Sequence, residues 1–166
     1  MTTLAPTTTS GTTRARAALV VTAALLALVD LGLKAWARTA LANGHAIDLG
    51  PLQLRLGFNS GVAFSLGADL PAGVVLGGTG LIIVALSVFA WRAVRTATLP
   101  ARLALTAMLA GAVANLIDRA ADGMVTDYLH TGWFPTFNLA DVFITAGAVA
   151  LVLVSLTTSD TADDAP

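Results

Sequence analysis

Four long apolar stretches constrain this chain more than any other feature of its sequence. Three carry no charge, and the first is interrupted only by Asp30 and Lys34; they cover residues 17–37, 70–91, 103–117 and 142–159. An α-helix rises about 1.5 Å per residue, so about 20 residues cross the hydrocarbon core of a bilayer. We therefore predict four transmembrane helices, of which the third must extend through Asp118 and Arg119 to span.

The scarcity of charge supports the same class of protein. Only 11% of the residues are charged, against about 25% in soluble domains, and the mean hydropathy is +0.80. A soluble domain with so few charges could not cover its surface. The composition excludes a soluble enzyme, a disordered chain and a nucleic-acid-binding protein.

Few side chains are available for chemistry. The chain has no cysteine and no glutamate, and its two histidines, His45 and His130, belong to no zinc-binding motif. Disulfides and thiol nucleophiles are excluded, and a zinc site built by the protein is disfavoured. Acid–base chemistry would depend on the ten aspartates.

The basic residues indicate how the helices are oriented, because Lys and Arg in short loops mark the cytoplasmic side. The densest basic clusters are formed by Arg14, Arg16, Arg92, Arg95 and Arg102. Both termini are therefore expected in the cytoplasm, with the longer connections outside. We divide the chain into a disordered cytoplasmic tail (1–16), a four-helix membrane domain (17–156) and a second cytoplasmic tail (157–166).

The first outer connection carries a strand pattern. Apolar and polar residues alternate over 47–49 and 52–56, which is the period of a half-exposed strand. The predicted fold class is thus an all-α membrane protein, with four transmembrane helices and a small extracytoplasmic β-sheet in the first outer loop.

Asp30 and Lys34 need an explanation, because ionisable groups inside a membrane are costly. Their i, i+4 spacing suits either a helical ion pair or a pair that shapes a site. The two charges also argue against an alternative interpretation of the first run as a cleavable signal peptide.

The third run places Gly111, Asn115 and Arg119 on one helix face at a spacing of four. Small residues permit close approach of helices, and Asn can donate across the interface. Arg119 requires a carboxylate partner, and Asp118 lies on a different face.

Two aspartates flank the last outer loop. Asn138 is predicted to be the N-cap of the fourth helix, with Asp141 in its first turn. Asp127 precedes them in a short extended segment. Two close carboxylates that share a proton can hydrolyse an amide, because one activates water while the other protonates the carbonyl. The residues alone thus lead to the hypothesis of an aspartyl hydrolase.

Five segments, taken in order, resemble the lipoprotein signal peptidase (signal peptidase II) family of bacterial membrane aspartyl proteases. They are Asp30–Lys34 (Asp-x-x-x-Lys), Asn59–Ser65 (Asn-x-Gly-x-Ala-Phe-Ser), Asn115–Arg119 (Asn-Leu-Ile-Asp-Arg), Gly123–Tyr128 (Gly-x-Val-x-Asp and an aromatic) and Phe137–Asp141 (Phe-Asn-x-Ala-Asp). The resemblance covers about residues 17–156. Ala114 and Val142 depart from the residues usual in the family.

The resemblance implies a role for each matching residue. Asp127 and Asp141 would form the catalytic dyad, while the supporting and substrate-binding residues would be Asp30, Lys34, Asn59, Gly61, Asn115, Arg119 and Asn138. The substrate would be a diacylglyceryl-modified prolipoprotein, cleaved just before its lipidated Cys. The family implies no metal or cofactor, and a bacterial inner-membrane enzyme whose active site lies at the outer face. We expect a monomer that contacts membrane lipid and no nucleic acid.

Two other functions remain open on the residues. A small proton-coupled transporter would need Asp30 and no long outer loops. A catalytically inactive relative that serves as a scaffold would not need Asp127 and Asp141.

Overall fold

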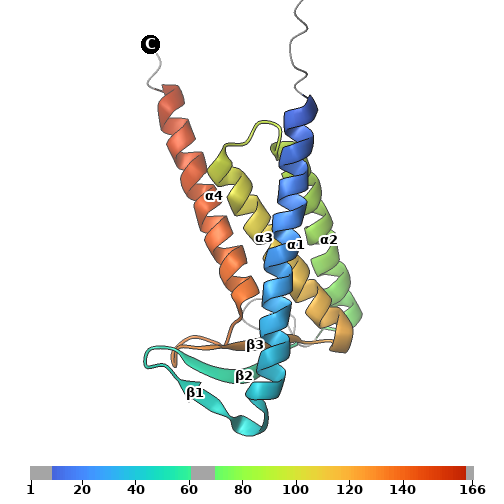
Figure 1. Cartoon of the computed structure of the whole chain (residues 1–166), viewed down its shortest axis with the longest axis vertical. Coiled ribbons are helices and arrows are strands. Elements are labelled where there is room, and N and C mark those ends of the chain that lie inside the picture. Colours follow the sequence, from blue (N-terminus) through green and yellow to red (C-terminus); the bar gives the residue numbers. More distant parts are fainter. Residues whose placement is uncertain (1–8, 61–69, 164–166) are drawn as a thin grey trace, which may run out of the picture.

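A computed structural model describes residues 9–60 and 70–163 of the chain, in which four helices form a bundle with a small sheet at one end (Figure 1). The elements in order are α1 (Thr9–Ala40), the 3-10 turn η1 (Ala42–Gly44), β1 (Ala46–Asp48), β2 (Gln53–Asn59), α2 (Ala72–Ala93), α3 (Leu99–Asp122), β3 (Val125–His130) and α4 (Leu139–Asp163). Each of the four helices is long and apolar enough to cross a membrane, which confirms the predicted fold class.

The helices extend beyond the apolar runs that predicted them. α1 begins at Thr9, so residues 9–16, assigned to a tail on sequence, are helical; the remainder of that segment, 1–8, lies outside the described residues. α4 likewise continues to Asp163. α3 passes through Asp118 and Arg119 as predicted and ends at Asp122, followed by the C-cap Gly123, whose φ of +81° favours glycine.

The sheet joins the α1–α2 and α3–α4 connections, whereas the sequence placed it in the first of these alone. Its strand order is β1-β2-β3, with both pairs antiparallel. Gly57 lies opposite Asp127 in the register, after an irregularity that follows Leu54. The sheet packs against the end of α1 through a buried cluster that includes Leu41 and Tyr128. The sheet thereby brings Asp127 to the ends of the helices.

Two glycines allow α3 and α4 to pack closely. A Cβ at Gly147 would lie 2.7 Å from the carbonyl oxygen of Ala104, and one at Gly111 would clash with the carbonyl oxygen of Ala140. Ala114, a departure from the family, is fully buried and packs against Ala140. The close approach predicted at Gly111 is therefore present, and it places the first turn of α4 beside Asn115.

Gly111→Ala is expected to destabilise the fold by about 1–3 kcal/mol, because the added methyl group forces α4 away from α3. The matched control is Gly78→Ala, since a Cβ at Gly78 meets nothing within 4 Å. That control should be neutral or slightly stabilising. Denaturant unfolding in detergent measures both variants, and equal stabilities would contradict the packing argument.

Candidate active site

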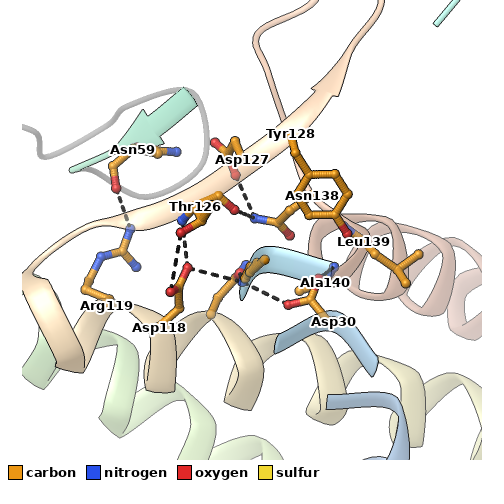
Figure 2. Close-up of polar contacts among 12 residues, drawn as sticks. Asp30, Asn59, Asp118, Arg119, Thr126, Asp127, Tyr128, Asn138, Leu139 and Ala140 are labelled. Carbon is orange, nitrogen blue, oxygen red and sulfur yellow. Dashed lines mark hydrogen bonds and ion pairs between the residues drawn. The ribbon is translucent and has the colours of Figure 1, made fainter. Parts of the chain in front are cut away.

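Asn138 contacts both aspartates of the predicted pair. Its side-chain Oδ1 accepts a hydrogen bond from the Asp141 N–H at 2.9 Å, and its own N–H donates to Asp141 Oδ2 at 3.2 Å. This reciprocal arrangement is a capping box, and it agrees with the prediction that Asn138 is the N-cap and that Asp141 lies in the first turn. Asn138 Nδ2 also donates to Asp127 Oδ1 at 2.6 Å (Figure 2). The fully buried Asn138 thus holds two carboxylates together, that of Asp127 by its side-chain amide and that of Asp141 by its backbone N–H.

Asp127 is poised to hold a proton near neutral pH. Its side chain is buried, and this burial, reinforced by the negative charge of Asp141, raises the pKa of Asp127 to about 7. Like charges that lie close together cannot both ionise readily. The pair therefore suits chemistry in which one carboxyl group gives a proton and the other takes one.

A buried chain of polar contacts supports Asp141 from the opposite side. Asn115 Nδ2 donates to Asp141 Oδ1 at 2.8 Å, and Lys34 Nζ donates to Asn115 Oδ1 at 2.6 Å. Because lysine can only donate, it fixes which end of the Asn115 amide faces Asp141. Both oxygens of Asp141 therefore face N–H donors, which suits a carboxylate that accepts a proton.

Asp30 and Lys34 form the predicted i, i+4 ion pair, with 2.9 Å between Lys34 Nζ and Asp30 Oδ2. The pair is buried in the bundle: Asp30 is 0% and Lys34 1% exposed. Asp30 Oδ1 also accepts the N–H of Ala140 in the first turn of α4 at 2.9 Å. The pair thus links α1 to the helix that carries Asp141.

Arg119 and Asn59 also meet. Arg119 is buried, and its Nη2 lies 3.5 Å from the carbonyl oxygen of Asn59 (Figure 2). Its charge acts electrostatically on Asp127 and Asp141, which agrees with its expected need for carboxylates. Gly61, which the sequence placed with Asn59, lies outside the described residues.

Sequence reasoning missed three residues that hold strand β3, namely Arg38, Asp118 and Thr126. Asp118 Oδ2 accepts the N–H of Thr126 at 2.6 Å and lies 3.6 Å from Lys34 Nζ. Arg38 contacts both Asp118 and Thr126. A signal was available, because Arg38 follows Asp30 and Lys34 at the same spacing of four.

Tyr128 secures the other side of the site. Its hydroxyl oxygen accepts the N–H of Leu139 at 3.2 Å, so the strand after Asp127 is tied to the start of α4. Burial raises the pKa of Tyr128 to about 12, which keeps the phenol neutral. In residues 9–60 and 70–163, no group of three or more His, Cys, Asp or Glu side chains is placed to hold a metal ion.

Comparison with known proteins supports one family. Residues 22–157 match the family described as signal peptidase (SPase) II. The lipoprotein signal peptidases of Brucella ovis and Brucella melitensis are each 38% identical to this chain over 134 residues, covering 78% of it and 83% of each relative.

Solved structures share the fold. A bacterial membrane enzyme determined by the in meso method at 2.3 Å resolution superposes with a TM-score of 0.75 at 23% identity, covering 90% of this chain and 92% of that one. A second bacterial membrane enzyme, determined at 1.9 Å resolution, gives 0.72 at 26% identity, covering 84% and 93%.

Proposed function

The chain belongs to the signal peptidase II family, whose members remove signal peptides from lipoproteins, and we propose that Asp127 and Asp141 are its catalytic pair. The observation that carries this proposal is the position of Asn138, which donates to Asp127 Oδ1 at 2.6 Å and to Asp141 Oδ2 at 3.2 Å. An enzyme that uses two carboxylates must hold them together at fixed separation.

In the proposed mechanism, a water molecule between the two carboxylates attacks the scissile carbonyl carbon. Asp141 takes a proton from this water, and Asp127 gives its proton to the carbonyl oxygen. The tetrahedral intermediate then collapses: its hydroxyl proton returns to Asp127, the C–N bond breaks, and Asp141 transfers its proton to the leaving amine. Both aspartates end in their starting protonation states, and no covalent bond to the enzyme is formed.

The proposed substrate is a prolipoprotein whose Cys carries a diacylglyceryl group, cleaved just before that Cys. At about 0.8 kcal/mol per buried CH₂, two acyl chains keep such a substrate in the bilayer. A protease for it needs carboxylates where the spans end and water can enter. The positions of Asp127 in β3 and of Asp141 in the first turn of α4, at the ends of the helices, support this proposal.

A cleavage assay tests the proposal. Purified protein in detergent is incubated with a diacylglyceryl-modified prolipoprotein and, in parallel, with the same prolipoprotein without the lipid. The masses of the products are measured by mass spectrometry. Cleavage of the lipidated chain alone, immediately before the modified Cys, is the expected result. Equal cleavage of both chains would refute the lipid requirement.

In the proposed orientation both termini lie in the cytoplasm, and the sheet and the two aspartates lie at the outer face. The enzyme is also proposed to act as a monomer. The chain has no cysteine, so single introduced thiols report their side of the membrane. In intact cells a membrane-impermeant maleimide should label His45→Cys, beside the sheet, and leave Thr96→Cys, between α2 and α3, unlabelled. The reverse pattern would invert the topology.

The cleavage rate is expected to fall as the pH rises through about 7. Burial and the charge of Asp141 raise the pKa of Asp127 to about 7, so below that pH Asp127 holds the proton needed by the carbonyl oxygen. Above it this proton is lost, so the loss of activity lies on the alkaline side. The pH profile of kcat/KM, which reports ionisations of the free enzyme, measures this effect, and a value still rising well above neutral pH would contradict the assignment.

A further inference from the structure

Arg38 binds three acceptors on two other elements from the last turns of α1. Its Nε donates to Thr126 Oγ1 at 2.7 Å, its Nη1 to Asp122 Oδ2 at 2.7 Å and its Nη2 to Asp118 Oδ1 at 2.8 Å. The planar guanidinium presents its donors in a fixed fork, which holds the three groups in one arrangement. The end of α3 and strand β3 are thereby fastened to α1.

Thr126, the β3 residue that Arg38 binds, directly precedes Asp127 in the chain. Thr126 is fully buried, and its N–H donates to Asp118 Oδ2 at 2.6 Å while its hydroxyl binds Arg38. Successive side chains of a strand point to opposite faces. Arg38 therefore holds β3 from the face opposite Asp127, where it cannot touch the reacting atoms.

Arg38 also balances a buried charge. Asp118 is 7% exposed and forms a second, longer ion pair with Lys34, whose Nζ lies 3.6 Å from Asp118 Oδ2. Lys34 is already committed to Asp30 at 2.9 Å and to Asn115 at 2.6 Å. Without Arg38, Asp118 would compete for Lys34, and the contact by which Asn115 positions Asp141 would be disturbed.

We propose that Arg38 is a positioning residue for the cleavage reaction: by clamping Thr126 and Asp118, it holds Asp127 in register with Asn138 and Asp141. This inference rests on the proposed catalytic pair. It adds to the site a residue that lies outside the motifs and acts only through the strand and the buried charges.

The charged groups that act on Asp127 come from three helices: Lys34 from α1, Asp118 and Arg119 from α3, and Asp141 from α4. Removal of the positive charge of Arg38 leaves more of the negative charge of Asp118 uncompensated, and this negative charge acts on Asp127. The proton of Asp127 would then be held more tightly, and the alkaline limb of the pH profile would move to higher pH.

The test compares Arg38→Gln, which removes the charge and the fork, with Arg38→Lys, which keeps only the charge. Cleavage of a diacylglyceryl-modified prolipoprotein gives kcat and KM across pH, and thermal unfolding in detergent gives the folded fraction. The matched control is Arg95→Gln, which removes an exposed arginine from the α2–α3 connection.

Both Arg38 variants should lose about tenfold or more in kcat with little change in KM, because a misplaced carboxylate slows chemistry rather than binding. Only Arg38→Gln should move the alkaline limb upward, and Arg95→Gln should match the unaltered chain. Folded Arg38 variants with unchanged kcat and an unchanged pH profile would overturn the role proposed for Arg38 and leave the proposed function standing. Absence of cleavage by the unaltered chain would overturn the proposed function and this inference with it.

Discussion

Asp127→Asn is expected to abolish cleavage while leaving the fold intact. Asn keeps an oxygen that can accept the 2.6 Å hydrogen bond from Asn138 Nδ2, so the local structure survives. It cannot exchange a proton with the scissile carbonyl, and loss of acid–base catalysis costs about 10²- to 10⁴-fold. Initial rates on a diacylglyceryl-modified prolipoprotein, beside an unfolding curve, measure the two effects separately.

Asp141→Asn should be equally inactive but less stable. The two oxygens of Asp141 accept from Asn115 Nδ2 and from the Asn138 N–H, so the NH₂ group of an Asn there must face a donor. The control is Asp48→Asn, an exposed aspartate at the end of β1 whose Oδ1 accepts the Gly50 N–H and can be replaced by an amide oxygen. Cleavage by either dyad variant at the rate of the control would remove Asp127 and Asp141 from the mechanism.

Lys34→Met is expected to cost about 3–5 kcal/mol of stability, because it leaves the fully buried Asp30 without its partner. Activity should fall as well, because Lys34 also fixes the amide of Asn115 that faces Asp141. Denaturant unfolding in detergent and the cleavage rate are the two measurements.

The double variant Asp30→Asn/Lys34→Met separates these two roles of Lys34. Removal of both charges should restore much of the stability, since Asn retains an acceptor for the Ala140 N–H. It should not restore the cleavage rate, because Asn115 still lacks its anchor. Recovery of stability and rate together would show that Lys34 acts only as a counterion.

The helices were predictable because membrane solvation leaves a long, simple signal in the sequence. Long apolar runs located four spans, and the sequence predicted Asn138 as the N-cap of the last helix with Asp141 in its first turn. The i, i+4 spacing similarly predicted the Asp30–Lys34 pair, although not its complete burial. Each of these features depends on residues close together in the chain.

The remaining features depend on contacts between distant segments. Strand β3 pairs with β2, from which α2 and α3 separate it in the chain, so no local pattern predicts the pairing. The hydrogen bond from Arg38 to Thr126 joins residues 88 positions apart. The spacing of Arg38 after Lys34 places it on the same helix face but does not identify its partner. Helix boundaries were similarly displaced, because a helix that is already packed can continue through polar residues such as those at 9–16.

The proton that Asp127 is proposed to carry can be tested for directly by infrared spectroscopy of the protein in detergent. Just below neutral pH, one protonated carboxyl band should be present, disappear with a midpoint near pH 7 and be absent from Asp127→Asn, because the pKa of Asp127 is raised to about 7. Exposed aspartates protonate only at much lower pH and do not interfere. A spectrum without a protonated carboxyl group at that pH, or a band that persists in Asp127→Asn, would contradict the assignment of Asp127 as the proton donor of a catalytic pair.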